Sequence, residues 1–325
     1  MATIKDVAKE AGVAVETVSR VLNNRGYISD KTRNKVYEAM KSLNYTPNTF
    51  AQGLSKKNMD AIAVIVPHVE HPFFSKVISR LEKEISRRGY RFFLYNSSGD
   101  IKNEEKVLKL CESSFMTGAL LFSADYDTDM LKRFQIPIVL VERKAENDIC
   151  SVCCDNKMGG RLAASRLIED GCKSLLIFNT GNIIAMPGDE REKEFVKTAK
   201  KSEVSCKVYR SSALQYMANS HYDIIKKALL ENPSCDGIFA TSDVIAAQVI
   251  QVCDSMGKRI PKDIKLVGFD DVILSTLTTP SITTIRQPVE EIASLAVDVI
   301  EKLSEGKKVR SSYKLPVELI ERQSG

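Results

Sequence analysis

The sequence lacks several features that mark large classes of protein. It contains no tryptophan, only three histidines in 325 residues, and no apolar run close to the ~20 residues that a membrane-spanning helix needs. Its first residues hold no apolar core of the kind found in secretory signals, so we expect a cytoplasmic protein without a membrane partner. The eight cysteines are then expected to be reduced thiols rather than disulfides.

Signatures of common enzyme chemistry are missing as well. No G-x-G-x-x-G motif follows a strand pattern and no Walker A motif occurs, so nothing supports nucleotide chemistry. With three histidines and no G-x-S-x-G motif, hydrolysis is unsupported too, and we expect neither an enzyme nor a cofactor. The cluster Cys150, Cys153 and Cys154 has no second Cys or His pair at zinc-site spacing, so we interpret it as part of a buried strand without a metal.

Charged residues are unevenly distributed along the chain. The first 58 residues hold 10 lysines and arginines against 5 aspartates and glutamates, whereas the rest of the chain holds 37 of each. The net charge of +5 therefore belongs entirely to this basic start. A small basic segment on a neutral body predicts a polyanionic partner for that segment.

The basic start has the residue pattern of three short helices. Thr3 is a capping residue before an apolar stripe, and Gly12 ends this first helix. A second helix is expected over residues 14–22, and Ser29 caps a third helix that stops near Asn44. Two short helices around a glycine turn, braced by a third, predict a helix-turn-helix module that presents its second helix to the DNA major groove. The alternative is a three-helix bundle with a solvated basic rim.

The outward face of the second helix carries side chains that suit DNA. Arg20 can donate to guanine O6 and N7, and Glu16 can accept from cytosine N4. Phosphate contacts position a protein on DNA without reading its sequence. We expect them from Thr17, Ser19, Arg25, Lys31 and Arg33.

The order of residues in this segment resembles the DNA-binding domain of the lactose repressor family. The matching motifs are residues 4–13, 17–23, 31–33 and 44–48. The resemblance implies that Val15, Glu16 and Arg20 read bases. Further candidate DNA contacts inside the segment are Thr3, Asn23 and Asn48. The family's serine at the start of the second helix is Ala14 here, which is expected to weaken the helix start by roughly 1 kcal/mol.

Residues 48–58 link the basic start, residues 1–47, to the rest of the chain. They can form a short helix, but Gly53 and the small length make it marginal in isolation, so a flexible tether is the alternative. The family resemblance implies a hinge helix that orders on DNA and wedges Leu54 into the minor groove.

From residue 60 to 325, short apolar runs alternate with amphipathic helical patterns. This alternation predicts parallel sheets covered by helices, and a break near residues 155–160 favours two subdomains. The predicted fold is therefore an N-terminal all-α helix-turn-helix head followed by two doubly wound parallel-sheet α/β subdomains. The predicted strands are residues 61–67, 90–98, 118–123, 137–142, 175–179, 237–241 and 266–270. The predicted helices include residues 75–88, 160–170, 221–230 and 245–256.

Charged and aromatic residues gather at the predicted carboxyl ends of these strands, where ligands bind in such sheets. They are His71, Phe73, Phe74, Glu142, Arg143, Arg191 and Asp270. Aromatic faces pack on C–H groups, and guanidinium and carboxylate groups bond hydroxyls, so the set predicts a neutral sugar or polyol as ligand. Singly, each residue is more often a surface charge or a core aromatic, so the prediction depends on their shared edge.

The body resembles the effector domain of the same family, which is similar to periplasmic sugar-binding proteins. The markers are residues 72–74, 136–143, 239–243, 267–271 and 283–287. The resemblance implies three chain crossings, with one subdomain at about residues 60–156 and 286–312 and the other at about 157–285 and 313–325. It implies ligand contacts at Phe74, Glu142, Arg143, Arg191, Ser242, Asp270 and Gln287.

Four positions depart from the pattern of sugar-binding members. Glu142 stands where aspartate is usual, and His71, Ser123 and Ser242 stand where asparagine is common. Losing amides removes paired donors and acceptors that suit vicinal hydroxyls. The departures weigh against a familiar hexose or ribose and leave a different or larger carbohydrate.

Together with the resemblance, these observations predict a homodimeric, ligand-responsive repressor of carbohydrate-utilisation genes. Two heads would bind the half-sites of a near-palindromic double-stranded operator, and a sugar between the subdomains would control DNA affinity. No heptad repeat follows the last strand pattern, so a tetramer through a C-terminal coiled coil is not expected. The alternative is a small-molecule sensor whose basic segment tethers it to another protein, without sequence-specific DNA binding.

Overall fold

The computed structural model describes residues 2–47, 53, 58–122, 128–143, 149–180, 187–212, 214–215 and 218–325. The chain divides into two compact units, one made of Met1–Asp60 with Ser113–Met116 and one made of the rest. We call residues 2–47 the head and the chain from Ala61 the body. Among the described residues, no helix has the length and apolar character that a membrane crossing requires.

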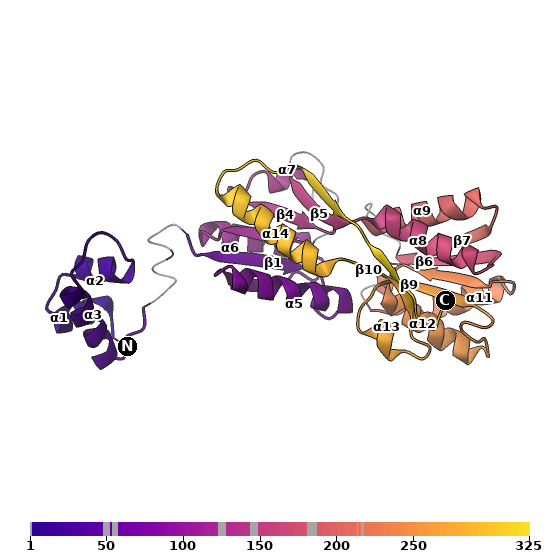
Figure 1. Ribbon diagram of the computed structural model, residues 1–325, viewed down its shortest axis with the longest axis horizontal. Coiled ribbons are helices and arrows are strands. Elements are labelled where there is room, and N and C mark those ends of the chain that lie inside the picture. The colour runs from indigo at the N-terminus through magenta and orange to yellow at the C-terminus, as the bar shows by residue number, and fades with distance from the viewer. Residues whose placement is uncertain are drawn as a thin grey trace. The chain divides into compact units, whose positions relative to one another are not determined.

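Three helices form the head, α1 (Ile4–Ala11), α2 (Val15–Leu22) and α3 (Asp30–Ser42) (Figure 1). Their apolar stripes close on a small core. It consists of Val7, Ala8, Ala11, Val18, Val21, Val36 and Ala39. Each helix contributes to this core, so the packing of all three fixes the orientation of α2.

The helix ends of the head follow the capping pattern of the sequence. The Thr3 side chain accepts from the backbone N–H of Asp6, and the Asp6 carboxylate accepts from the backbone N–H of Thr3 at 2.8 Å. Gly12 ends α1 with φ at 64°, a left-handed conformation that glycine adopts without strain. Ser29 caps α3, whereas Ala14 at the start of α2 makes no side-chain cap bond, as predicted.

The first subdomain of the body is a six-stranded sheet with the order β11-β5-β4-β3-β1-β2 and parallel pairings. Its strands are β1 (Ala61–Val66), β2 (Arg91–Asn96), β3 (Gly118–Leu121), β4 (Ile138–Val141), β5 (Cys150–Cys154) and β11 (Ser312–Leu315). The helices that go with it are α5 (Pro72–Arg87), α6 (Ile101–Ser113), α7 (Thr128–Leu131) and α14 (Val289–Ser304). Every residue of β1 is buried, as expected for a strand covered on both faces.

The second subdomain is a six-stranded sheet with the order β12-β10-β9-β8-β6-β7, in which β12 alone runs antiparallel to its neighbour. Its strands are β6 (Ser174–Thr180), β7 (Ser205–Ser211), β8 (Gly237–Ala240), β9 (Lys265–Asp270), β10 (Thr283–Arg286) and β12 (Glu318–Ile320). Its helices are α8 (Asn156–Glu169), α9 (Pro187–Lys201), α11 (Tyr222–Glu231), α12 (Asp243–Ser255) and α13 (Leu274–Leu277). The helical head and the two doubly wound subdomains confirm the predicted fold class.

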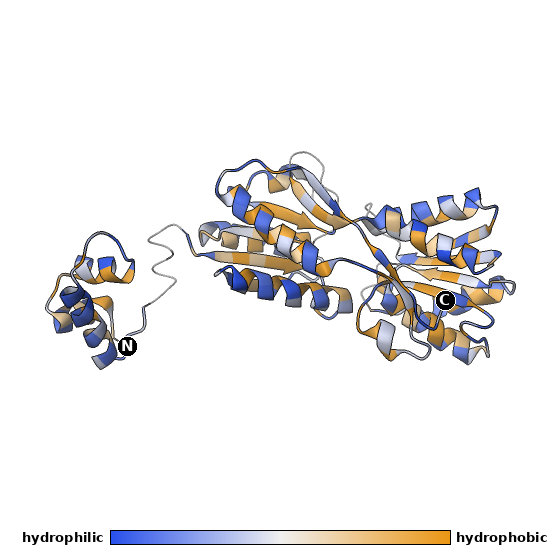
Figure 2. Cartoon of the chain, viewed as in Figure 1, coloured by the Kyte–Doolittle hydropathy of each residue, from blue (hydrophilic) through white to orange (hydrophobic). Residues whose placement is uncertain are grey.

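Apolar residues concentrate on the strands and on the helix faces that cover them, as Figure 2 shows. Helix α5 is an example, because it buries Val77, Leu81 and Ile85 at helical spacing while its other face stays polar. At the carboxyl ends of the strands, buried polar side chains such as those of Glu142, Asp270 and Gln287 lie next to the apolar core.

The chain crosses between the two sheets after β5, after β10 and between β11 and β12. The last crossing corrects the prediction, which assigned residues 313–325 to the second subdomain. Ser312–Leu315 pairs in parallel with β5 and therefore belongs to the first sheet. Its residues alternate between exposed and half-buried at the sheet edge, so no continuous apolar run marks this strand in the sequence.

Candidate nucleic-acid interface and ligand site

Helix α2 packs one face on the head core and leaves the other in solvent. Val18 and Val21 are buried, whereas Glu16 and Arg20 are exposed and lie four residues apart on the same face. The guanidinium of Arg20 lies over Gly26, where a Cβ atom would be 2.6 Å from its Nη2 atom. The missing side chain of Gly26 thus leaves room for the side chain that is predicted to read guanine.

The other predicted DNA contacts surround this helix. Thr3, Arg25 and Lys31 are exposed, and Val15, Thr17, Ser19 and Arg33 are half-buried. Arg33 Nη2 donates to Asn24 Oδ1 at 3.1 Å, so it reaches the loop after α2. Asn48 and Leu54 lie outside the described residues, and the hinge helix stays a prediction.

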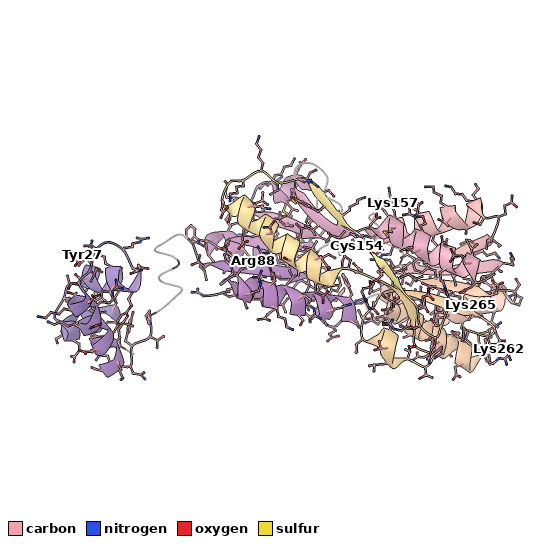
Figure 3. The ribbon with its side chains drawn as sticks, viewed as in Figure 1. Tyr27, Arg88, Cys154, Lys157, Lys262 and Lys265 are labelled. Carbon is pink, nitrogen blue, oxygen red and sulfur yellow. The ribbon has the colours of Figure 1, made fainter. Side chains whose placement is uncertain are left out.

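The structure adds detail at Asn23 and Tyr27. Asn23 Nδ2 donates to the carbonyl oxygen of Ser19 at 2.9 Å at the end of α2, and its contact with DNA stays a prediction. Tyr27 carries no prediction, yet it is 94% exposed on the head surface (Figure 3). The exposure of this ring has no signal in the sequence.

Three of the predicted ligand residues form one polar cluster at the ends of β9 and β10. Arg191 Nη1 lies 3.7 Å from Asp270 Oδ1, and Gln287 Nε2 donates to the same oxygen at 2.7 Å. Gln287 Oε1 is buried and has no hydrogen-bond partner among the described residues. Because buried acceptors are nearly always paired, this oxygen can still accept a hydrogen bond from a ligand or from a water molecule.

The Asp270 carboxyl lies between opposing influences. Burial and, less strongly, the Glu142 carboxylate of the first subdomain raise its pKa, Arg191 and Gln287 lower it, and the net result is a pKa of about 6. The effect of Glu142 means that the ends of β4 and β9, one from each subdomain, are close enough to interact. The backbone is unusual there too, with φ of 53° at Glu142 and 102° at Asp270, the kind of strain that gathers at functional sites.

Aromatic rings form a buried wall at the end of β1. The ring of Phe74 contacts those of Phe73, Phe122 and His71 edge to face, with centroids 5.4, 5.9 and 5.6 Å away. His71 Nδ1 accepts from the backbone N–H of Phe73 at 3.3 Å and caps α5. Burial lowers the pKa of His71 to about 4, so its imidazole is neutral at pH 7.

Three residues that are predicted to contact the ligand have side-chain atoms that are hydrogen-bonded to the protein backbone. Glu142 Oε1 accepts from the backbone N–H of Cys154 at 2.5 Å, and Arg143 Nε donates to the carbonyl oxygen of Phe122 at 3.1 Å. Ser242 caps α12 by accepting from the backbone N–H of Ile245. Their direct role in ligand binding stays a prediction, and Ser123 lies outside the described residues.

The sequence missed several residues that build this junction. Phe122 completes the aromatic wall, and Asn156 Oδ1 accepts from Arg191 Nε at 2.5 Å. Lys76 Nζ, from α5 of the first subdomain, donates to the carbonyl oxygen of Asp271 at 2.8 Å and ties the two subdomains together. Phe122 and Asn156 follow strands closely, a signal that the sequence offered, whereas Lys76 lies within a helix and gave none.

A cavity of about 230 Å³ adjoins His71 at the edge of the junction. Its lining is His68, Val69, Glu70, His71, Asn96, Ser98 and Asn219. The first six come from the first subdomain and Asn219 from the second, so the cavity also spans both.

Comparisons with known proteins agree along the whole chain. A model of bacterial regulatory proteins of the lacI family matches residues 3–48, and a periplasmic binding protein-like domain matches residues 164–325. The ribose operon repressor of Halalkalibacterium halodurans is 35% identical, covering 100% of this chain and 97% of that protein. The chain belongs to the lacI family of bacterial regulatory proteins. It is a DNA-binding transcriptional repressor that responds to a ligand.

Other relatives of this lacI-family repressor cover it equally well. The sucrose operon repressor of Streptococcus mutans is 33% identical over 100% of this chain and 99% of that protein. The structure of a transcriptional regulator CelR–cellobiose complex is 25% identical, covers all of both chains and has a TM-score of 0.73. The Lac repressor dimer bound to operator, at 23% identity and a TM-score of 0.87 over 99% of this chain and 98% of that chain, shares the fold.

The cysteines of this lacI-family repressor are free thiols. Burial raises the pKa of Cys150, Cys172 and Cys206 to about 11, so these thiols are protonated and unreactive at neutral pH. Within the part of the chain that the structure describes, no three His, Cys, Asp or Glu side chains are grouped to hold a metal.

Proposed function

We propose that this repressor controls carbohydrate-utilisation genes and that its ligand is a carbohydrate bound at the junction of the two subdomains. One observation carries the proposal: Arg191, Asp270 and Gln287 form a buried polar cluster in which Gln287 Oε1 has no hydrogen-bond partner among the described residues. A guanidinium, a carboxylate and an amide together supply the donors and acceptors that adjacent hydroxyl groups require. The aromatic wall around Phe74 supplies the apolar face.

The names of relatives support a carbohydrate. Two are repressors of ribose and sucrose operons, and one solved structure, 28% identical with a TM-score of 0.71, is a complex with D-xylulofuranose. The purine class is the rival, since a repressor named PurR from Edwardsiella ictaluri is 29% identical over the whole chain.

We further propose that the protein acts in the cytoplasm as a homodimer on a near-palindromic operator. Exposed Arg20 and Glu16 would read base edges in each half-site. The ligand would change DNA affinity by favouring one arrangement of the subdomains, which the three crossings and Lys76 connect. It shifts this equilibrium only by its differential affinity for the two arrangements.

A thermal-unfolding screen of the full chain tests the ligand class. The panel is D-ribose, D-xylulose, sucrose, cellobiose, hypoxanthine and guanine. A carbohydrate at 100 times its Kd is expected to raise the free energy of unfolding by about 2.7 kcal/mol, and Asp270→Asn to abolish the rise. Stabilisation by the purines alone would contradict the carbohydrate assignment while leaving the repressor intact.

A further inference from the structure

Helices α8 and α9 lie side by side (Figure 1), and their backbones approach closely at Gly160. A Cβ atom on Gly160 of α8 would lie 2.1 Å from the carbonyl oxygen of Arg191 and 3.0 Å from its Cα atom. The obstacle is main chain, so it cannot move aside as a flexible side chain does. Any side chain at Gly160 would push the backbone of Arg191 away from α8.

The neighbouring Gly159 makes room for the surface on which the Arg191 side chain lies. A Cβ atom on Gly159 would be 2.6 Å from Cε2 of the Phe269 ring. The Arg191 guanidinium lies above this ring, 3.5 Å from its centroid. Gly159 therefore lets the Phe269 ring approach α8. The ring in turn fixes how far the Arg191 guanidinium lies from α8.

Asn156, the first residue of α8, fixes the rotation of the Arg191 guanidinium in the plane of that group. Asn156 is 2% exposed, and its Oδ1 atom accepts from Arg191 Nε at 2.5 Å. Its Nδ2 atom donates to the carbonyl oxygen of Cys154 at 3.2 Å, which orients the amide so that Oδ1 faces Arg191. With Nε held in this way, Nη1 is directed toward Thr241 O at 2.8 Å and Asp270 Oδ1 at 3.7 Å.

We propose that Asn156, Gly159 and Gly160 act together as a seat that positions the Arg191 guanidinium for ligand recognition. The inference rests on the proposed function, in which Arg191 contacts the effector. The three residues are positioning residues, because they act through Arg191. Glycine disfavours a helix, so two adjacent glycines inside α8 are explained by the close approach that they allow. Binding groups need placement to within about half an ångström, and this seat provides it.

The first test needs no ligand, because the charge of Arg191 lowers the pKa of Asp270. The Asp270 carboxyl is titrated by carbon NMR of the full chain with labelled aspartate, and its signal is assigned with Asp270→Asn. Arg191→Gln serves as the reference, because it shows how far the pKa of Asp270 rises when the guanidinium is lost completely. Gly160→Ala is expected to raise it by at least half as much.

Gly188→Ala is the matched control. Gly188 lies in α9 three residues before Arg191, and a Cβ atom there meets nothing within 4 Å. It is expected to leave the pKa of Asp270 unchanged. A folded Gly160→Ala protein with an unchanged pKa would overturn the inference.

Asn156→Leu covers the case in which Gly160→Ala does not fold. It removes the acceptor for Arg191 Nε without touching the backbone contact between the helices. The pKa of Asp270 is expected to rise here as well, and a pKa equal to that of the unaltered protein contradicts the seat.

Calorimetry with D-ribose, sucrose and cellobiose separates the inference from the proposed function. Where a sugar binds, Gly160→Ala and Asn156→Leu are expected to weaken its affinity at least tenfold, while the DNA affinity of the ligand-free protein stays the same. Unchanged affinity in Arg191→Gln would refute the ligand site itself. Lost affinity in Arg191→Gln with full affinity in Gly160→Ala and Asn156→Leu would refute only the seat.

Discussion

At the scale of single residues, the sequence predicted which side chains lie at the strand ends. It did not predict which groups those side chains bond. Arg191, Asp270 and Gln287 were predicted as ligand contacts, and the structure brings their polar groups together. Glu142 was predicted on the same grounds, yet its carboxylate accepts from the backbone of Cys154. A sequence gives the end of a strand, whereas the neighbour that a side chain bonds depends on the pairing of strands far apart in the chain.

Arg20→Ala tests the recognition helix. Loss of the guanidinium is expected to weaken binding to the specific operator by roughly 1–3 kcal/mol, because a bidentate contact to guanine is lost. Binding to unrelated DNA and to the ligand should change little. The measurement is a fluorescence-anisotropy titration on both DNAs.

Arg25→Ala is the comparison variant for Arg20, since Arg25 is an exposed basic residue predicted to contact phosphate. It should weaken binding to all DNA alike and flatten the salt dependence. Full operator specificity in the Arg20→Ala protein would refute the assignment of α2 as the reading element.

His71 gives a pH dependence of stability. Its folded-state pKa of about 4 lies below the ordinary value of 6.5, so between these pH values the folded protein binds fewer protons than the unfolded chain. The free energy of unfolding therefore falls as the pH drops from 6.5 to 4, with about 3 kcal/mol of the fall due to His71. His71→Asn keeps an acceptor for the α5 cap and should lessen the fall by that amount in urea titrations. Parallel curves for both proteins would be inconsistent with a buried neutral imidazole.

At the scale of helices and strands, burial explains part of what the sequence could predict, although the half-exposed edge strand β2 was predicted and the mostly buried β10 was not. The uniformly apolar β1, β3, β4 and β8 were predicted because each of their residues is buried, which leaves an unbroken apolar run. Strand β7 lies at a sheet edge with only its last residue buried, and it was missed. Such an edge strand is defined by its pairing, here with β6, rather than by its own composition.

Ala14→Ser tests the start of α2. The serine side chain would accept one of the free backbone N–H groups of the first turn, which is expected to stabilise α2 by about 1 kcal/mol. Hydrogen exchange of the α2 amides should slow roughly fivefold. The opposite change is Ser29→Ala, which removes the existing cap of α3 and should speed exchange in α3. Identical exchange rates in α2 with and without the serine would mean that the first backbone N–H groups of α2 already have hydrogen-bond partners.

At the scale of the whole molecule, three chain crossings connect the subdomains, and this arrangement was predicted except for its last step. The sequence misplaced residues 313–315 because their pairing with β5 joins segments about half the chain apart. The aromatic wall, the tie made by Lys76 and the seat of Arg191 depend on such long-range packing. None of them repeats at a helical or strand period, so no local pattern marks them.

The proposed homodimer predicts how affinity depends on operator length. A DNA fragment with two half-sites should bind far more tightly than one with a single half-site, because the second head binds without a new loss of translational freedom. Moving the half-sites apart by five base pairs places them on opposite faces of the helix and should reduce affinity to that of one half-site. Anisotropy titrations with the three fragments measure this, and equal affinity for all of them would contradict the dimer.

The central claim is that a carbohydrate at the junction of the subdomains changes the DNA affinity of the head. The direct measurement is an anisotropy titration of the full chain on its operator, with and without the stabilising carbohydrate at 100 times its Kd. We predict a change in operator affinity of roughly 5- to 150-fold in the unaltered protein and none in Asp270→Asn, which should bind operator normally without the sugar. Equal operator affinity with the carbohydrate bound and absent would contradict the account.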